Sequence, residues 1–422
     1  MTRALGSLQV AALLVSASYG IGFLFGSGEM ALAHGMAGSI YGVATAFGML
    51  VLALFARRLW AVGLPVWALF GRAYGAQLQG VVALLSLVWM SGVLAAQIQG
   101  GVAVLALLGL DEARGYLAIL LLIYGASRMD LRFASVVFAA CLLVSAAVLV
   151  YALVVANGVG LYLQAIPTFT EDLSTFSPSR VVAISLAVGL LVCTGADYQQ
   201  FVLAARTPGS AVRGCLLAGL VVLFVGFLPS AVIVAMQNDG ALVGWSNTKQ
   251  VVPWVLGQVA GSLGQGADKL MLIALSLAAL GAGAAILRAM TDALACAVSG
   301  KRVASHPVFA LIALGASALL ASRNQGIVNT MVSVNVVYIA SIGVCFATMV
   351  TGIVIPPQQA RWIMAVGFVA SVAVYLVGWL GNHGEDTDVI SLVLGCFLSA
   401  AIALWFRLAA GGWSGRFSGI RR

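Results

Sequence analysis

The chain has 422 residues, of which 62% are hydrophobic and 8% are charged, and its formal net charge is +8 at pH 7. This composition excludes a soluble globular domain, because such domains carry about 25% charged residues. It indicates a polytopic membrane protein. The positive charge is explained by membrane orientation, and no basic run alternates with aromatic residues, so we expect no nucleic-acid partner.

The apolar segments of the chain are long enough to cross a bilayer, whose core of about 30 Å requires roughly 20 apolar residues per helix. We predict twelve spans, which are 8–33, 39–56, 76–110, 116–127, 133–157, 181–205, 211–237, 270–299, 303–321, 327–355, 362–381 and 389–409. The fourth span is short. The predicted fold class is therefore an all-α polytopic membrane protein with about 12 transmembrane helices.

The first predicted span is interrupted by four glycines and a carboxylate, and reads SASYGIGFLFGSGEMA from Ser16 to Ala31. Lipid cannot satisfy free backbone N–H and C=O groups, so irregular backbone at this depth must be buried in protein or line a watery cavity. The sixth span is interrupted at Gly189, Gly195 and Asp197. Paired interruptions in two halves of a chain indicate the midplane site of a secondary transporter.

The loop charges predict the orientation, because cytoplasmic loops collect Lys and Arg. Fifteen of these residues fall on the side of the N-terminus and five on the other, with Arg288 alone inside a span. We therefore expect a multi-pass inner-membrane protein with both termini in the cytoplasm. The C-terminal GRFSGIRR fits contact with anionic lipid headgroups or, more simply, ordinary positive-inside anchoring.

The cysteines and histidines argue against an enzyme. The six cysteines lie in apolar spans without CxxC spacing, which disfavours metal and disulfide roles. The three histidines lie far apart at span ends, so no catalytic constellation can be assembled from them. We expect no classical cofactor.

A split after the fifth span places the two interrupted helices in equivalent, oppositely oriented positions. The predicted organisation is a first five-helix repeat at 1–157, an outer loop at 158–180, a second inverted five-helix repeat at 181–355, and two peripheral C-terminal helices with a basic cytoplasmic tail at 356–422.

The stretch GADYQQFVLAARTPGSAVRGCLLAGLVVLFVGFLPS, from Gly195 to Ser230, resembles the sodium:solute symporter family. The similarity lies in a Gly-x-Asp-x-x-Gln pattern, an Ala-Ala-basic end to the sixth core helix, and a Gly-rich seventh helix with a proline. Weaker similarity extends from about Ser16 to Ser299 and includes LPVWALFGRAYG at 64–75. The resemblance implies the LeuT-like fold of the amino acid-polyamine-organocation superfamily, with two inverted five-helix repeats, alternating access and, usually, sodium coupling.

The chain departs from this family near the expected cation site between the first and eighth core helices. Depending on the alignment, the family's hydroxyl residues on the eighth helix are replaced by Ala282 and Gly283 or by Ala289 and Met290. Neither pair supplies the oxygen ligands that hard cations prefer. We hypothesise that the positive charge of Arg288 replaces sodium, and coupling to Na⁺ or to H⁺ stays open.

Four ionisable residues remain at membrane depth, and intramembrane charge is a functional hypothesis by default. Arg288 and Asp292 are spaced i, i+4 and can pair, with Asp197 as a third member of a charge network. A purely structural pair that locks two helices carries equal weight. We expect Glu29 to begin the outer half of the first helix, where it either caps that half-helix or takes part in proton coupling or substrate binding.

Candidate substrate contacts follow from depth and chemistry. They are Ser16, Ser18, Tyr19 and Gly20 on the first helix, Trp89 and Ser91 on the third, Tyr198 on the sixth, and Asn335 and Tyr338 on the tenth. Serine and glycine in membrane helices also serve close helix packing. Trp89 is either a core residue or a stacking wall.

Together these features predict a secondary active transporter that moves a small polar organic solute by alternating access, coupled to a cation. The alternative is a transporter-like membrane sensor or subunit that binds a solute without moving it. A membrane enzyme and a channel rank below the transporter and the sensor. A midplane site on broken helices suits coupled transport better than conduction through an open pore.

Overall fold

The computed structural model describes residues 3–129, 131–245, 247–299, 307–323, 326–353, 355–380 and 386–409. Within these ranges the chain is helical and has no strand, and one isolated bridge joins Leu5 to Ala205. The basic tail from residue 410 onward, together with His306 and His383, lies outside the described residues.

The helices follow the predicted spans closely. In the first half they are α1 (Ser7–Ser18), α2 (Ile21–His34), η1 (Gly35–Ser39), α3 (Ile40–Val62), α4 (Val66–Tyr74), α5 (Ala76–Leu107), α6 (Glu112–Ser127), α7 (Leu131–Val155), α8 (Val159–Leu163), α9 (Ala165–Asp172) and η2 (Leu173–Thr175). In the second half they are α10 (Pro178–Thr194), α11 (Ala196–Leu203), α12 (Pro208–Gly226), α13 (Leu228–Asn238), η3 (Thr248–Gln250), α14 (Val251–Gly261), α15 (Ala267–Ser299), α16 (Pro307–Ala321), α17 (Ile327–Thr351), α18 (Pro357–Leu380) and α19 (Asp386–Ala409).

Three pairs of helices, α1 with α2, α10 with α11, and α12 with α13, each correspond to one predicted span. The short helices α4, α8, α9 and α14 lie in the connections between spans. By length and hydropathy alone, seven helices in the described ranges could cross a membrane, or eight when α10 and α11 are taken as one bent span. The remaining spans are shorter helices that pack against these.

Local sequence explains where several helices begin. Asp111, Ser177 and Thr207 each accept a hydrogen bond from the backbone N–H three residues later, at 3.2, 3.4 and 3.0 Å. Such an N-cap oxygen satisfies an N–H group that the helix itself leaves free. Pro178 and Pro208 follow at the first helical position, where a missing N–H breaks no helical bond.

The first and sixth spans are broken, as the sequence predicts. The first break lies at Tyr19 and Gly20, where Gly20 is extended with ψ 176°. The second break lies at Gly195, which is extended with φ −67° and ψ 128°, and α10 and α11 are bent there by 40°. An extended residue interrupts the helical hydrogen-bond ladder, so backbone groups at both breaks need other partners.

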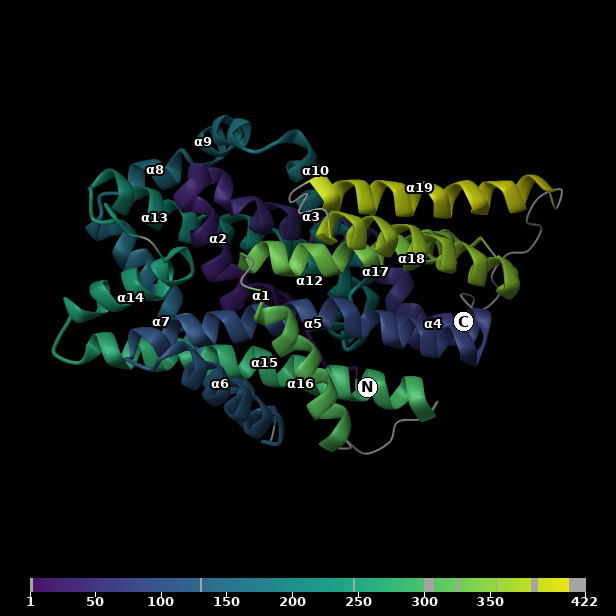
Figure 1. Cartoon of the computed structure of the whole chain (residues 1–422), viewed down its shortest axis with the longest axis horizontal. Helices are drawn as coiled ribbons and strands as arrows, with labels where there is room; N and C mark the ends of the chain where they lie inside the picture. The colour runs from purple at the N-terminus through teal and green to yellow at the C-terminus, as the bar shows by residue number, and fades with distance from the viewer. Residues whose placement is uncertain are drawn as a thin grey trace.

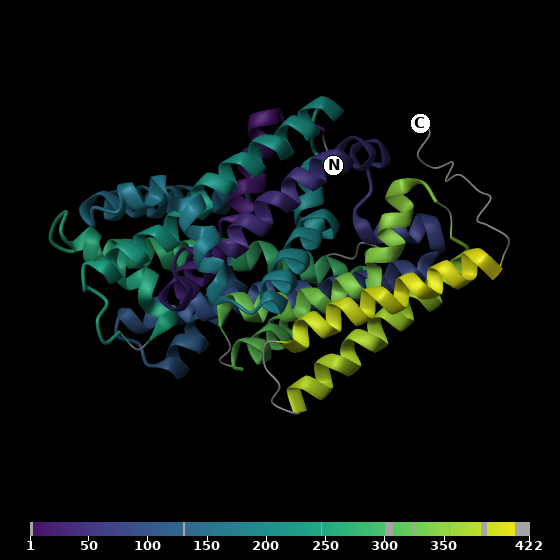
Figure 2. The same ribbon diagram turned by 90° about the horizontal axis from the view of Figure 1, so that it is seen from above.

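The helices pack in two connected groups around these breaks. In one group α3 lies against α10 and α12, and α12 also contacts α1; in the other, α5 lies against α15, α16 and α17. Figure 1 shows α5 and α15 running side by side along the long axis of the molecule. The last two helices, α18 and α19, pack on each other and on α17 at one edge (Figure 2).

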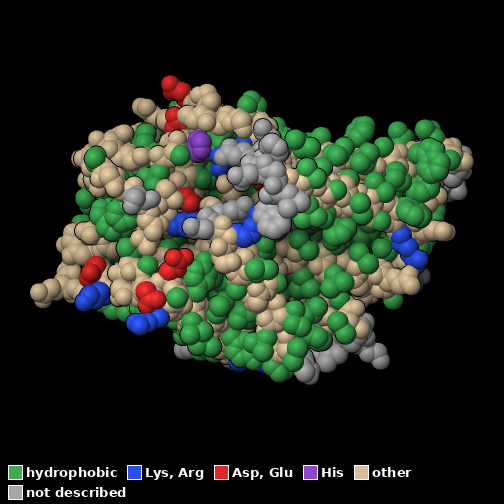
Figure 3. All heavy atoms as spheres, in the orientation of Figure 1, with side chains coloured by type: hydrophobic (Ala, Val, Ile, Leu, Met, Phe, Trp, Pro, Cys, Tyr) green, Lys and Arg blue, Asp and Glu red, His purple; other side chains and the backbone are tan. Residues whose placement is uncertain are grey.

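The visible surface is largely apolar, and its acidic side chains gather toward one end of the long axis (Figure 3). Hydrophobic side chains cover much of the face in Figure 3, and the acidic side chains visible there lie toward the end that carries α8, α9 and α14. Large side chains on α12, α18 and α19 are exposed, among them Phe224, Val377 and Phe397. Basic side chains are visible toward both ends of this face (Figure 3). A broad apolar flank of this kind is typical of helices that pass through lipid.

Close approach of α3 to α10 depends on Gly48. A Cβ added at this position would lie 2.8 Å from the carbonyl oxygen and 3.0 Å from the Cα of Gly189. Both atoms belong to the backbone, so they cannot move aside as a flexible side chain would. Small residues are what allows helix backbones to approach this closely in a membrane.

We expect Gly48→Ala to lower the melting temperature of the purified protein, because the added methyl group pushes α3 away from α10. Overpacking of this kind costs about 1–3 kcal/mol. Gly315→Ala on α16 is the matched control, since an added Cβ there meets no atom within 4 Å. Equal melting temperatures for Gly48→Ala and the unmodified protein would contradict the close packing of the two helices.

Candidate functional site

The first break lies against an amide side chain of α5. A Cβ added to Gly20 would lie 3.4 Å from Nε2 of Gln97, and one added to Gly22 would lie 3.3 Å from the same atom. The Cβ added to Gly22 would also lie 3.6 Å from Sδ of Met331 on α17. The break between α1 and α2 is therefore enclosed by α5 and α17 rather than by lipid.

At the second break, side chains satisfy the backbone carbonyls that the interrupted helix leaves free. The Tyr338 hydroxyl on α17 donates to the Thr194 carbonyl at 3.1 Å. The Gln199 amide on α11 donates to the Cys193 carbonyl at 2.9 Å. Both contacts are buried, so the irregular backbone at Gly195 is held by protein groups, as irregular backbone at membrane depth must be.

Aromatic rings surround the two breaks. The rings of Trp89 on α5 and Tyr338 on α17 have centroids 6.2 Å apart and are inclined by 53°. At the first break, the ring centroids of Tyr19 and Phe23 lie 5.2 Å apart. Phe23 in turn packs edge-on against Tyr41 of α3, with ring centroids 5.7 Å apart. These rings form walls that are apolar on their faces and carry polar groups at their edges.

Several buried polar atoms beside the breaks have no hydrogen-bond partner within the described part of the chain. They are the Tyr19 hydroxyl, Trp89 Nε1, Gln97 Oε1, Asp197 Oδ1, Gln199 Oε1 and both amide atoms of Asn335, while Ser27, Ser39 and Tyr74 carry further such atoms elsewhere. Buried polar groups are normally satisfied, and an unsatisfied one costs about 1–3 kcal/mol. Their concentration here indicates a site that receives polar groups from a ligand or an ion.

We refer to this group of residues as the central cluster. It consists of Tyr19, Gly20, Trp89, Gln97, Asp197, Asn335 and Tyr338. Five of these residues were candidates from the sequence as substrate contacts, and Asp197 was a candidate for the charge network. The structure brings them together from four different spans, although they are up to 319 positions apart in the sequence.

The remaining substrate candidates lie differently. Ser18 is buried but donates to the Leu14 carbonyl of its own helix at 2.9 Å, and Ser91 likewise donates to the Leu87 carbonyl at 2.7 Å. Ser16 is exposed and does not join the central cluster. Two residues correspond to about 200° of rotation on an α-helix, so Ser16 and Ser18 face opposite sides. Tyr198 is buried directly after Asp197.

The sequence interpretation missed Gln97 and Gln199. Gln97 lies in the stretch QIQG inside a long apolar span, and an amide at that depth is itself a signal of a polar site. Gln199 lies next to the break and follows Asp197 by two positions. Tyr41 was missed as well, and nothing in its apolar surroundings sets it apart.

Glu29 connects two helices at the end of the molecule that carries α14. Its Oε2 accepts a hydrogen bond from the backbone N–H of Ile327 at 2.9 Å, and its Oε1 accepts one from the Thr248 hydroxyl at 3.1 Å. The expectation that Glu29 begins the outer half-helix is wrong, because α2 begins at Ile21, about two turns earlier. The helix N-terminus that Glu29 caps is that of α17.

Two basic residues lie around this contact. Arg180 donates to Oδ1 of Asn329 on α17 at 3.2 Å. Burial lowers the pKa of Lys249 in η3, and the charge of Glu29 opposes that shift. We refer to the contacts of Glu29 with Ile327 and Thr248 and of Arg180 with Asn329 as the outer contact.

Arg288 holds the end of α6. Its guanidinium donates to the carbonyls of Ala126, Ser127 and Met129 at 2.8, 2.5 and 2.5 Å. A cation is well placed at a helix C-terminus, where free carbonyls carry partial negative charge. This arrangement ties α15 to α6 through backbone carbonyls rather than through the charge pair of the structural alternative.

Asp197 lies apart from Arg288. It occupies the first turn of α11, and the rings of Tyr41, Tyr198 and Tyr338 lie within range of its charge. Among the described residues it forms no ion pair, and the structure does not join it to Arg288. The predicted three-member network is therefore not formed, while the pairing of Arg288 with Asp292 stays a prediction.

A second contact joins the opposite ends of the two broken spans. The backbone N–H groups of Ala4 and Leu5 both donate to the Ala204 carbonyl at 3.1 Å, and the N–H of Arg206 donates back to Leu5 at 2.8 Å. Trp60 Nε1 donates to the Ala205 carbonyl at 2.7 Å. We refer to this set as the inner contact.

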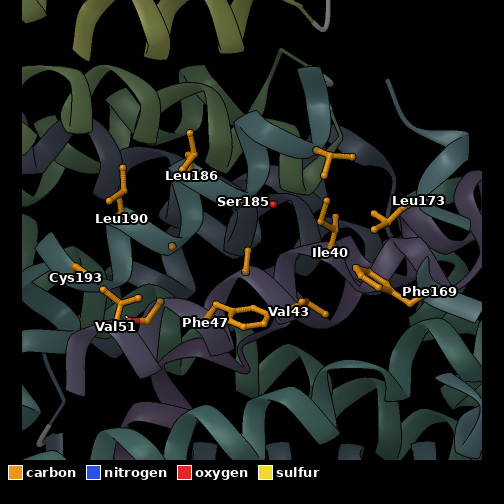
Figure 4. Close-up of a pocket in the computed structure, with 14 residues that line it drawn as sticks. Ile40, Val43, Phe47, Val51, Phe169, Leu173, Ser185, Leu186, Leu190 and Cys193 are labelled. Carbon is orange, nitrogen blue, oxygen red and sulfur yellow. Dashed lines mark hydrogen bonds between the residues drawn. The ribbon is translucent and has the colours of Figure 1, made fainter. Parts of the chain in front are cut away.

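A separate pocket of about 340 Å³ lies between α3 and α10 (Figure 4). It is lined by apolar side chains such as Phe47, Leu186 and Leu190, with Ser185 as a polar member. Among the described residues, neither a member of the central cluster nor a charged side chain lines it. Such a lining offers nothing to an ion or a strongly polar solute.

Comparisons with known proteins identify the fold. No protein-family model matches the chain, and no curated protein sequence matches it. A Na⁺-coupled sialic acid symporter in a substrate-bound outward-open state is similar in structure, with 14% identity, a TM-score of 0.58, and coverage of 94% of this chain and 95% of that one.

Two further solved structures are similar over almost the whole chain. A nucleobase-cation-symport-1 family transporter, closed with bromovinylhydantoin bound, has 15% identity, a TM-score of 0.59, and coverage of 99% of this chain and 96% of its own. A manganese transporter from Eremococcus coleocola has 14% identity, a TM-score of 0.57, and coverage of 99% and 95%. The chain has the LeuT-like fold of two inverted five-helix repeats followed by two helices, as the sequence predicts.

We expect Tyr338→Phe to lower the melting temperature, because the Thr194 carbonyl at the second break loses its donor. A buried carbonyl left without a partner costs about 1–3 kcal/mol. Tyr151→Phe on α7 is the matched control, since that side chain is exposed. If both variants melt at the temperature of the unmodified protein, the hydroxyl does not hold the break.

Proposed function

We propose that the chain is a secondary active transporter that carries a small polar organic solute across a membrane by alternating access. The observation that carries the proposal is the central cluster, where unpartnered polar atoms collect at two broken helices inside an apolar bundle. The shared fold supports it, since the three similar structures are transporters. A fold alone does not establish a function, so the weight rests on the cluster.

The outer and inner contacts support alternating access. The outer contact joins α2 to α17 and η3, and the inner contact joins the start of α1 to the end of α11. They lie at opposite ends of the two broken spans, with the central cluster between them. A carrier that alternates must break one such set while the other remains formed.

We assign the coupling cation, Na⁺ or H⁺, to Asp197. Its Oδ1 is buried beside the second break and has no hydrogen-bond partner in the described ranges. Hard cations prefer oxygen ligands, and a carboxylate also accepts a proton. Arg288 is a weaker candidate for a sodium substitute, because its guanidinium already binds three carbonyl groups of the α6 end.

The same proposal includes the orientation and the organisation of the chain. The two repeats are 1–157 and 181–355, joined by the outer loop 158–180 and followed by 356–422. Both termini face the cytoplasm of an inner-membrane protein, and lipid surrounds the apolar flank. The excess of Lys and Arg on the side of the N-terminus supports this orientation.

A transporter-like sensor is the second candidate, because it needs the same binding cluster. Counterflow separates the two functions, since a sensor binds a solute but does not exchange it across a vesicle membrane. Binding raises the melting temperature by mass action, so a solute is first found by melting the protein with candidate compounds in Na⁺ and in K⁺ buffer.

We expect the protein in proteoliposomes to show counterflow of the solute found in this way, and Asp197→Asn to abolish the dependence on the coupling cation. An amide neither carries a negative charge nor takes up a proton at neutral pH. Asp239→Asn, at an exposed position after α13, is the matched control. Binding without counterflow would establish the sensor, and unchanged cation dependence in Asp197→Asn would remove that residue from coupling.

We expect Glu29→Ala to increase amide hydrogen exchange at the start of α17, because the N–H of Ile327 loses its acceptor. Glu29→Gln keeps a neutral acceptor oxygen and should give an intermediate increase. Glu171→Ala on the exposed face of α9 is the control. Unchanged exchange in Glu29→Ala would contradict the outer contact, and unchanged pH dependence of uptake in Glu29→Gln would exclude a proton-coupling role for this carboxyl group.

A further inference from the structure

The unpartnered groups of the central cluster also indicate what kind of solute it receives. We infer that the site takes an uncharged solute that presents a hydrogen-bond donor beside an acceptor. This inference rests on the proposed transport function. It goes beyond that proposal because it selects one chemical class among small polar solutes.

The amide of Asn335 is the first of these unpartnered groups. Its side chain is fully buried, and neither its amide nitrogen nor its amide oxygen has a partner among the residues that the structure describes. An amide offers donors and an acceptor side by side, so a ligand satisfies both only with an acceptor next to a donor. The two atoms are both unsatisfied, so the requirement is the same if the amide is turned over.

Asn335 lies on α17 between two residues that contact the breaks. Met331, one turn before it on α17, lies at the first break near Gly22, and Tyr338, about one turn after it, bonds the carbonyl at the second break. Residues three and four positions apart share one face of a helix. Asn335 therefore lies on the face of α17 that both breaks contact.

Neutral groups from other helices complete the site. Within the described part of the chain, Gln97 Oε1 on α5 is an acceptor without a donor, and the Tyr19 hydroxyl at the first break has no partner and can act as donor or acceptor. The faces of the Trp89 and Tyr338 rings suit a solute with a flat or apolar face.

The charges around the site disfavour an anion. Apart from Asp197, every unpartnered atom of the central cluster belongs to a neutral side chain. Arg288, the one basic residue predicted inside a span, binds the end of α6, and Arg180 binds Asn329 in the outer contact. Burial of a carboxylate without a basic partner is strongly unfavourable. The start of α2 at Gly20 attracts negative charge as any helix N-terminus does, and the charged probes below test it.

A cationic solute is disfavoured for a different reason. Asp197 is the one carboxylate in the central cluster, and tyrosines from α3, α11 and α17 lie around it. A solute cation would neutralise the same carboxylate that the coupling cation requires. With Asp197 assigned to the cation, only neutral groups remain to recognise the solute.

The variant Asn335→Leu tests the inference in the ligand-free protein, before the solute is identified. Leucine is close to asparagine in size and removes both unsatisfied groups, so the ligand-free protein should melt at the same or a higher temperature. Asn329→Leu on the same helix is the comparison, since Asn329 accepts a hydrogen bond from Arg180 and its loss should lower the melting temperature. If Asn335→Leu melts as low as Asn329→Leu, Asn335 has a structural partner and the inference is overturned.

Four probes then test the class of solute, each by its effect on the melting temperature in Na⁺ and in K⁺ buffer. Uracil presents amide edges, glucose presents hydroxyl groups, phenylalanine is a zwitterion and benzoate is a carboxylate. We expect a shift with uracil or glucose, and at least a tenfold loss of affinity for that probe in Asn335→Leu. A shift confined to phenylalanine or benzoate overturns the inference.

The two proposals fail in different ways. Counterflow of phenylalanine or benzoate would support the proposed transport function and overturn the inference that the solute is uncharged. Binding of uracil or glucose without counterflow would support an uncharged solute but indicate that the protein is a sensor and not a transporter. If none of the four probes shifts the melting temperature, the ligand-free melting of Asn335→Leu still decides whether the unsatisfied amide belongs to a binding site.

Discussion

The structure depends on one constraint, which is that a helix broken inside lipid must find partners for its free backbone groups within the protein. The break at Gly195 meets it through Tyr338 and Gln199, which donate to the two carbonyls before the break. The break at Gly20 meets it by enclosure between α5 and α17. These requirements bring four spans together in the interior of the bundle, and the polar side chains that lie there form the central cluster.

One helix, α17, connects the central cluster to the end of the molecule where Glu29 lies. Its first N–H group bonds Glu29 of α2, and its Tyr338 hydroxyl bonds the carbonyl at the second break. Between these contacts lies Asn335, with its amide unsatisfied. A rigid element that joins a closing contact to a binding site transmits a change at either one to the other. In the proposed transporter, α17 is the element that would link solute binding to opening at the outer contact.

The sequence predicts those features that local chemistry determines. The breaks follow from glycines inside apolar spans, and approximate helix bounds follow from apolar length. The caps at Asp111 and Ser177 were not used in the prediction, and α6 and α10 begin at Glu112 and Pro178, before the predicted starts at 116 and 181. Contacts between distant helices could not be predicted in the same way. Glu29 caps a helix that begins 298 positions later in the chain, and the contact of Arg288 with the α6 carbonyls joins two helices whose relative rotation no pattern in the sequence specifies. Ser16 was misplaced because depth alone does not give the face of a helix.

The unsatisfied polar atoms explain how a binding site can also favour closure. Each such atom costs about 1–3 kcal/mol in the empty protein, and the central cluster contains several, including both amide atoms of Asn335. In an open state water would satisfy these atoms, so only the closed state bears the free-energy cost of leaving them without partners. A solute that bonds two or three of them would remove that cost. Since about 1.4 kcal/mol corresponds to a factor of ten in an equilibrium, solute binding can shift the protein strongly toward the closed state. An empty carrier with the same groups closes less readily.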